Sequence, residues 1–367
     1  MAQDVSSSKS IPPELRRAMG TCFSVCVHRR PGLSFIDKVA NVGVSFLIPL
    51  GTIGKPGASY EENLNRLKHC RKKAAGMMPG IYEKSVKDRW KVTEVLVPRS
   101  DALGGDVKVL LHAPMSEHSD LPLVLWMHGG GTTLNECRDN YGADVFNAVS
   151  ATMETTAKFC WASVEYHLAP EMRFPQGVDD VCHAFEALRA PALAEAHGYD
   201  PQKIHLAGVS AGAFYAAHAG VRLAKSGVQL ASLGLLYVMG DPLMVGKSHR
   251  LHGDLPACPG SWLAWSWRVL LAEGGPEAGD GAPSAERLRA GSVLFLDWAA
   301  LRGTPVLNAL ASCDVLYDDG VSLGKVMREA GLEVEEFCAL GSHAMAHLFD
   351  KAAADKFFGW FRRALAP

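Results

Sequence analysis

The chain has 367 residues with a formal net charge of −2, and 48% of the residues are hydrophobic. This length and composition suit one large α/β domain with a substantial core. Because nucleic-acid-binding domains are usually strongly basic, no nucleic-acid partner is expected.

Residues 1–88 precede the first predicted strand. Residues 1–10 are polar and lack the apolar region of a secretory signal, which favours a cytoplasmic protein. The most apolar early run, Val42–Ile53, is too short to cross a bilayer, so we expect it to pack on the domain and expect no transmembrane segment. Basic residues gather in Arg66–Lys91, and the simplest interpretation is a solvated helical face.

From residue 91 onward, short apolar or β-rich runs alternate with helical stretches. The predicted strands are 91–98, 106–113, 121–128, 159–167, 203–209, 230–239, 305–313 and 332–340. The predicted helices are 176–196, 211–225, 321–330 and 350–364. Strands that alternate with helices predict an α/β fold with a mostly parallel central sheet flanked by helices.

Two regions depart from this alternation: residues 1–88 lie before the sheet, and residues 241–303 separate two predicted strands. The second region carries the tryptophans Trp262, Trp265, Trp267 and Trp298. Long connections inside a compact domain usually form lids or caps. We therefore predict an N-terminal cap segment at 1–88 and a cap insertion at 241–303, which pack together over one edge of the sheet. The α/β domain itself is then 89–240 and 304–367.

The pentapeptide Gly208-Val209-Ser210-Ala211-Gly212 lies between a predicted strand and a predicted helix. A turn between them must be sharp, with Ser210 at its tip in a strained conformation and glycines where the neighbouring backbone passes close. The free N–H groups at the start of the following helix favour developing negative charge. Because the pentapeptide is common by chance, this context is what indicates that Ser210 is a nucleophile.

A run of glycines, His128-Gly129-Gly130-Gly131, directly follows the predicted strand 121–128. Glycines let backbone N–H groups face a cleft with no side chain in the way, as the negative oxygen of a tetrahedral intermediate requires. This tetrapeptide is far rarer by chance than the pentapeptide. It predicts an oxyanion loop, which His128 is expected to orient.

Four stretches, in the same order along the chain, resemble the hormone-sensitive-lipase-like branch of the α/β-hydrolases. They are the glycine run 128–131, Glu165-Tyr166-His167-Leu168-Ala169-Pro170-Glu171-Met172-Arg173-Phe174-Pro175, the pentapeptide 208–212, and Asp314-Val315-Leu316-Tyr317-Asp318-Asp319-Gly320. The resemblance implies an α/β-hydrolase fold with a catalytic domain at 89–240 and 304–367. It also implies a cap built from the N-terminal segment and the insertion.

The resemblance also implies roles for particular residues. It places the acid of a catalytic triad at Asp314, and it places oxyanion-binding N–H groups at Gly130, Gly131 and Ala211. The order Ser, Asp, His along the chain is that of this fold class.

Three positions depart from the family pattern. Val209 and His167 stand where an acidic residue and an arginine are usual, and Ala213 stands where a glycine is usual. None of them removes a catalytic group. They indicate a divergent member, so the family's substrates are not transferred to this chain.

Two histidines are candidates for the catalytic base. His347 lies in Met345-Ala346-His347-Leu348-Phe349, which resembles the family's Met-x-His-Gly-Phe. His343 follows the predicted strand 332–340 and Gly341, so it falls on the loop beyond that strand, where a base can reach the serine. Spacing favours His343, and His347 stays open.

Nine cysteines are scattered along the chain without the spacing of a zinc site. Cys22 and Cys26 lie four residues apart, but no second pair of ligands follows them. We therefore expect no metal, and no motif indicates a cofactor. Scattered, odd-numbered cysteines fit reduced thiols inside a cell.

These residues together predict a serine hydrolase that cleaves a small hydrophobic carboxylic ester through Ser210, Asp314 and His343, with an acyl-enzyme intermediate. The expected partner is a small acyl ester, and a homodimer is compatible with the sequence. Two alternatives stay open. One is an acyltransferase that uses the same triad, and the other is a non-catalytic small-molecule receptor on this fold.

Overall fold

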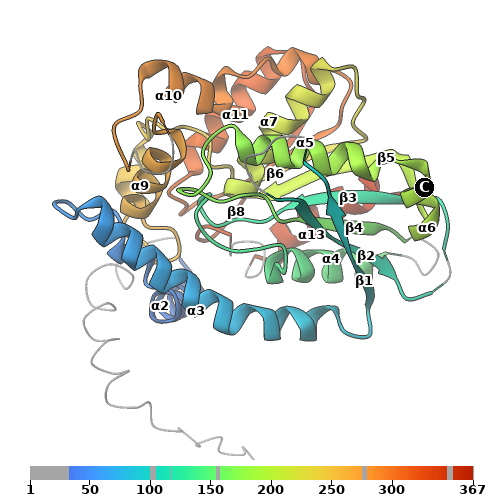
Figure 1. Cartoon of the computed structure of the whole chain (residues 1–367), viewed down its shortest axis with the longest axis horizontal. Coiled ribbons are helices and arrows are strands. Elements are labelled where there is room, and N and C mark those ends of the chain that lie inside the picture. Colours follow the sequence, from blue (N-terminus) through green and yellow to red (C-terminus); the bar gives the residue numbers. More distant parts are fainter. Residues whose placement is uncertain are drawn as a thin grey trace, which may run out of the picture.

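The computed structural model describes residues 33–99, 105–116, 118–153, 158–274, 279–344 and 350–366 (Figure 1). Cys22, Cys26 and His347 lie outside these residues, so what was predicted for them stays a prediction. Within the described residues, one eight-stranded sheet runs in the order β1-β2-β4-β3-β5-β6-β7-β8. The strands are β1 Trp90–Val97, β2 Val107–Pro114, β3 Leu121–Met127, β4 Cys160–Val164, β5 Tyr199–Val209, β6 Leu233–Leu236, β7 Val306–Ala311 and β8 Val334–Ala339.

The sheet is mostly parallel, as predicted. β2 pairs antiparallel with β1 and with β4, whereas every other neighbouring pair, from β4 through β3 to β8, is parallel. Parallel strands are usually covered by helices on both faces and are therefore apolar along their whole length. β3, β4 and β6 follow this rule, since almost every residue in them is buried.

Helices cover both faces of the sheet (Figure 1). One face carries α5 (Gln176–Leu188), α7 (Ala211–Lys225) and α11 (Tyr317–Glu329), and the other carries α4 (Asn140–Thr152) and α13 (Lys351–Ala364). Each face has its own apolar core. This arrangement confirms the α/β-hydrolase fold class that the sequence predicts.

Several predicted boundaries are wrong, each for a local reason. The helix predicted at 176–196 ends at Leu188, and a separate helix, α6 (Pro191–His197), follows it. Proline fixes φ and has no N–H, so it starts a helix where it would break the interior of one. The strand predicted at 230–239 stops at Leu236, because Tyr237 has a φ of 51° and turns the chain away.

The helix predicted at 321–330 begins four residues earlier, at Tyr317. The helix α4 was not predicted at all, although Asp139 caps it by accepting the N–H groups of Tyr141 and Gly142. An aspartate in this position is a common start signal for a helix.

The N-terminal segment supplies α2 (Phe35–Leu47), the 3-10 turn η2 (Leu50–Thr52) and the long helix α3 (Tyr60–Val86). Ser59 and Glu62 form a reciprocal cap at the start of α3. Lys68, Lys72 and Lys73 are exposed on α3, as expected for a solvated basic face. Arg71 departs from that expectation, because it is half-buried and donates to Thr133 O and Ala169 O. No helix of the described residues is long and apolar enough to cross a membrane.

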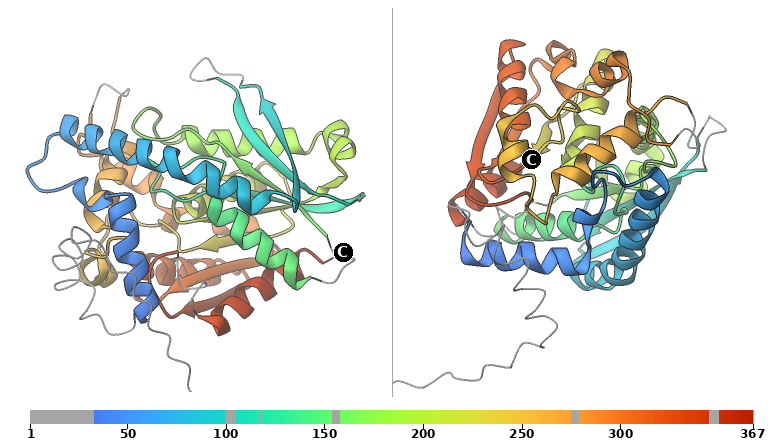
Figure 2. Two further views of the ribbon diagram at one scale, coloured as in Figure 1. Left: turned by 90° about the horizontal axis from the view of Figure 1, so that it is seen from below. Right: turned by 90° about the vertical axis from the view of Figure 1, so that its left-hand side faces the viewer.

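The insertion supplies α8 (Lys247–His252), α9 (Gly260–Leu271), α10 (Ala285–Gly291) and the short turns η4 (Val293–Phe295) and η5 (Trp298–Leu301). It packs against the N-terminal segment, since Ser261 Oγ donates to Ile53 O at 2.9 Å. Both views of Figure 2 place α2 and α3 beside this insertion. The N-terminal segment and the insertion meet over the end of the sheet at which β5 leads into α7, since both line the cavity that contains Ser210.

Candidate active site

Ser210 lies at the tip of the sharp turn between β5 and α7. Its φ of 58° and ψ of −117° are values that residues with a side chain rarely adopt. Two hydrogen bonds hold this strained backbone: Ser210 N–H donates to Leu236 O at 2.8 Å, and Met239 N–H donates to Ser210 O at 3.2 Å. The strain inferred from the strand–turn–helix pattern is therefore present.

The glycines on either side of Ser210 are there because backbone passes too close for a side chain. A Cβ on Gly208 would lie 2.4 Å from the carbonyl of Gly212, and one on Gly212 would lie 2.0 Å from Met127 O. Both distances are far below contact distance. The end of β3, the turn and the first residues of α7 can therefore approach one another only with glycine at these positions.

His343 and Asp314 form a buried pair beside this turn. The Nδ1 atom of His343 lies 2.7 Å from Asp314 Oδ2, and the other carboxylate oxygen accepts the N–H of Leu316 at 2.8 Å. Asp314 lies in the turn just beyond β7, and His343 lies in the loop just beyond β8. Because β7 and β8 are parallel neighbours, their carboxyl ends bring the two side chains together.

Two opposing effects set the pKa of His343 in this pair, and the one that favours the charged imidazolium is the stronger. Burial lowers the pKa of His343, but the Asp314 carboxylate raises it, and the net pKa lies well above its usual value. The Cys258 thiol of the insertion also hydrogen-bonds the imidazole. Since Nδ1 donates to Asp314, Nε2 is the nitrogen that is left to accept a proton.

Ser210 and His343 line the same cavity, of about 190 Å³. Its wall comes from all parts of the fold: Ile48 and Leu50 from the N-terminal segment, Ala257 and Trp262 from the insertion, and Gly129 and Gly130 from the glycine run. Burial leaves Ser210 4% exposed and His343 8% exposed, so the pair is largely shielded from water.

The glycine run passes directly beside Ser210. A Cβ on Gly129 would lie 3.4 Å from Ser210 Cβ, and Gly130 and Gly131 have positive φ values of 122° and 56°. His128 orients the run as predicted, because its Nδ1 lies 2.7 Å from Gly129 O while the Tyr166 hydroxyl donates to His128 O at 2.6 Å. Ala211, the third predicted oxyanion donor, is the first residue of α7.

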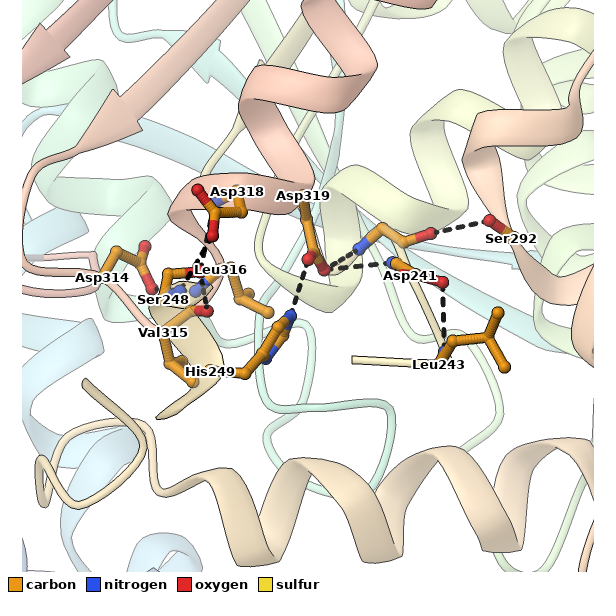
Figure 3. A network of polar contacts seen from close by, with 11 residues as sticks. Asp241, Leu243, Ser248, His249, Ser292, Asp314, Val315, Leu316, Asp318 and Asp319 are labelled. Carbon is orange, nitrogen blue, oxygen red and sulfur yellow. Dashed lines mark hydrogen bonds and ion pairs between the residues drawn. The ribbon is translucent and has the colours of Figure 1, made fainter. Parts of the chain in front are cut away.

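A buried network ties the start of the insertion to the loop of Asp314 (Figure 3). Ser248 of α8 donates its hydroxyl to Val315 O at 2.9 Å and its N–H to Asp318 at 2.8 Å. His249 Nε2 lies 2.7 Å from Asp319 Oδ1, and the second oxygen of Asp319 accepts the N–H groups of Gly240 and Asp241. Burial lowers the pKa of His249, but Asp319 outweighs burial and raises it above its usual value.

Asp139, Tyr141 and Tyr237 are among the residues around the cavity that were not predicted from the sequence. Asp139 and Tyr141 line it, and Asp139 also accepts the indole N–H of Trp126 at 2.7 Å. The ring of Tyr237 lies edge-on to the imidazole of His343, 6.0 Å between centroids, and its hydroxyl hydrogen-bonds that of Tyr141. Asp139 could have been found as a helix cap, but no local pattern marks the tyrosines.

Over the described residues, no three His, Cys, Asp or Glu side chains converge in a way that could hold a metal ion. His167, where the family pattern has arginine, is half-buried, and its Nδ1 lies 2.8 Å from the buried carboxylate of Asp180. Arg99 pairs with the same carboxylate at 2.5 Å. That departure from the family pattern therefore lies in a polar cluster of Arg99 just after β1, His167 in the loop after β4, and Asp180 of α5. None of the three lines the cavity of Ser210.

The chain is similar to proteins of known function. A family described as having the alpha/beta hydrolase fold matches residues 124–349. Neutral cholesterol ester hydrolase 1 of Bos taurus is 29% identical over 134 residues, covering 36% of this chain and 32% of that protein. Carboxylesterase NlhH of Mycobacterium tuberculosis is 36% identical over 108 residues, covering 29% of this chain and 31% of that protein. The chain thus matches about a third of the length of each relative.

The structure is also similar to solved structures. That of a bacterial heroin esterase superposes with a TM-score of 0.70 at 24% identity, covering 92% of this chain and 99% of the other. At this identity the likeness concerns the fold.

Proposed function

Because the chain belongs to the hormone-sensitive-lipase-like branch of the alpha/beta hydrolase fold family, we propose that it hydrolyses carboxylic esters with Ser210 as the nucleophile. The observation that carries this proposal is that Ser210 and His343 share one cavity while Asp314 holds the far nitrogen of the imidazole. Relatives named as ester hydrolases support the same reaction class.

The proposed reaction begins when His343 Nε2 removes the proton from Ser210 Oγ as this oxygen attacks the ester carbonyl carbon. Asp314 fixes the tautomer of the imidazole and stabilises the imidazolium. The tetrahedral intermediate then collapses, the imidazolium gives its proton to the leaving alcohol, and the acyl group stays on Ser210. Water attacks this acyl-enzyme with His343 as base and releases the acid.

The N–H groups of Gly130, Gly131 and Ala211 are proposed to bind the negative oxygen of the tetrahedral intermediate. The approach of Gly129 to Ser210 and the position of Ala211 at the start of α7 support this assignment. Preorganised donors of this kind contribute strongly, and removal of one typically lowers the rate by about 100-fold or more.

A small acyl group fits the first cavity, whose volume is about 190 Å³ and whose wall is largely apolar. A second cavity, of about 390 Å³, shares Met78, Asn135, Asp139 and Tyr141 with the first. We expect the larger part of a longer substrate to extend past Met78 into this second cavity, because the transfer of apolar groups out of water lowers the free energy.

Replacing Ser210 with alanine tests the proposal. With p-nitrophenyl butyrate, Ser210→Ala should lose activity by about 10⁴-fold or more and should no longer react with a fluorophosphonate probe. Ser232→Ala is the matched control, because Ser232 is also buried and its Oγ lies 2.8 Å from Nδ1 of a histidine, His205, but it precedes β6 and does not line the cavity of Ser210. Retained activity in Ser210→Ala would overturn the assignment.

Product analysis separates the proposal from its two alternatives. A hydrolase releases the free acid in buffer alone, whereas an acyltransferase needs an alcohol or amine acceptor for turnover. A receptor without catalysis would leave the fluorophosphonate probe unreacted in the unaltered protein.

A further inference from the structure

The loop that carries His343 has little regular structure of its own. β8 ends at Ala339, and the backbone then adopts positive φ at Gly341 and again at Ala344. Gly341 is held by the loop of Asp314, since it donates to Ser312 Oγ at 3.3 Å and accepts from Cys313 N at 2.9 Å. The next residue, Ser342, is held by a different part of the chain.

Helix α2 of the N-terminal segment holds Ser342. Asn41 Nδ2 donates to Ser342 Oγ at 2.9 Å, and Ser342 Oγ donates to Asp37 Oδ1 at 2.8 Å. The backbone N–H of Ser342 lies 3.4 Å from the same carboxyl oxygen. All three side chains are at most 1% exposed. Because water cannot reach them, loss of one partner leaves a buried polar group unsatisfied.

Asn41 also contacts the segment of the insertion that precedes Cys258. Its Oδ1 accepts the N–H of Ala257 at 3.2 Å, and Ala257 is followed by Cys258, whose thiol hydrogen-bonds the imidazole. The second proton of Nδ2 goes to Asp37 O at 2.9 Å. One amide side chain thus connects the two segments that flank the imidazole. Figure 2 shows α2 lying against the insertion and the C-terminal part of the chain.

We propose that Asn41 and Asp37 are positioning residues that hold His343 in line with Ser210; the inference rests on the proposed function. They act through Ser342 on one side and Ala257 on the other. Displacement of a base by about 1 Å costs up to about 100-fold in rate, whereas binding of the acyl group does not depend on that alignment. α2 therefore sets the efficiency of proton transfer as well as forming part of the cap.

The test compares two buried asparagines of the N-terminal segment. Asn41→Ala removes the contacts to Ser342 and Ala257. Asn63→Ala is the matched control, because Asn63 is 2% exposed and its Oδ1 accepts one backbone N–H, from Gly54 at 2.8 Å, within the N-terminal segment. Melting temperature, kcat and KM for p-nitrophenyl butyrate, and a crystal structure are measured for each variant.

Asn41→Ala should lower kcat by about 10-fold to 100-fold with KM changed less than about twofold. Its crystal structure should show His343 displaced from Asp314 Oδ2. Asn63→Ala should lower the melting temperature to a similar extent but keep kcat and the His343 position. The proposal is overturned if Asn41→Ala keeps both kcat and the imidazole position, or if Asn63→Ala loses as much kcat as Asn41→Ala.

Two variants of Asp37 give an independent check. Asp37→Asn keeps Oδ1 as an acceptor for the Ser342 hydroxyl, so it should restore most of the kcat that Asp37→Ala loses. Equal losses in both would argue against the hydrogen-bond chain. If Ser210→Ala were active, the proposed function would fail, but the crystal structures would still show whether α2 fixes His343.

Discussion

Trp262 of α9 donates its indole N–H to Thr133 Oγ1 at 3.1 Å, just beyond the glycine run. Its ring occupies the space beside Gly131, where a Cβ would lie 2.6 Å from Trp262 Cζ2. The insertion therefore packs directly on the proposed oxyanion loop. One side of that loop is therefore bounded by a residue from the insertion.

Gly131→Ala should lower both the activity and the stability of the protein. The new methyl group would meet the Trp262 ring at a residue whose φ is 56°, so we expect kcat to fall by about 100-fold and the free energy of unfolding by roughly 2 kcal/mol. Steady-state kinetics and urea unfolding measure the two effects. Gly227→Ala is the control, because Gly227 has a φ of 88° but open space around it. Gly227→Ala should lower the free energy of unfolding by about 1 kcal/mol and leave kcat unchanged.

The pH dependence should follow the ionisation of His343. The imidazolium cannot accept the serine proton, so kcat/KM should fall as the pH decreases through the pKa of His343, which Asp314 raises above 6.5. In Asp314→Asn the carboxylate no longer opposes burial, so the midpoint should move to lower pH while the plateau drops by up to about 10⁴-fold. An unchanged midpoint in Asp314→Asn would mean that another group controls the profile.

Breaking the buried pair of His249 and Asp319 should destabilise the protein strongly. His249→Phe leaves Asp319 without its charged partner in a site that is 3% exposed, and loss of one partner of a buried pair costs about 3 kcal/mol or more. Urea unfolding measures the effect. Glu335→Gln breaks the exposed pair of Glu335 with Arg363 and should cost less than about 1 kcal/mol. Comparable losses in both variants would contradict the role given to burial.

Met78 should limit the length of the substrate, because it lines both cavities. Met78→Ala removes most of this side chain, so kcat/KM for p-nitrophenyl decanoate should rise relative to the acetate by roughly 3-fold to 10-fold. Met78→Leu keeps the volume and should leave the ratio near that of the unaltered protein. A ratio that does not change in Met78→Ala would show that long chains take another route.

The turn of Ser210 and the glycine run could be recognised from residues that are adjacent in the sequence. Ser210 and its flanking glycines belong to one strand–turn–helix unit, whose chemistry can be inferred from adjacent residues. The glycine run is similar, because it follows directly on the buried strand β3. Asp314 was assigned from the family resemblance, and His343 was favoured by its position after the last predicted strand. The alternation of strands and helices was enough to predict the parallel sheet that carries both.

The remaining part depends on residues that are distant in sequence. Nothing near Asn41 indicates that it meets Ser342, and nothing near Tyr237 indicates that its ring lies against His343. Such contacts join elements that are far apart along the chain, and a single sequence has no periodicity that reports them. The same holds for Trp262, for which the sequence suits a cap residue or a core residue equally.

The link between Asn41 and Ser342 has a consequence for the order in which the protein can assemble. The two residues are 301 positions apart, so α2 can meet its partner only after a further 301 residues have been synthesised. Contacts that close such long loops are entropically costly and form late. A chain that stops before Ser342 contains the residues of the Ser210 turn but lacks His343, the proposed base. Under the proposed mechanism, activity therefore requires that synthesis has passed His343 and that α2 has docked on its loop.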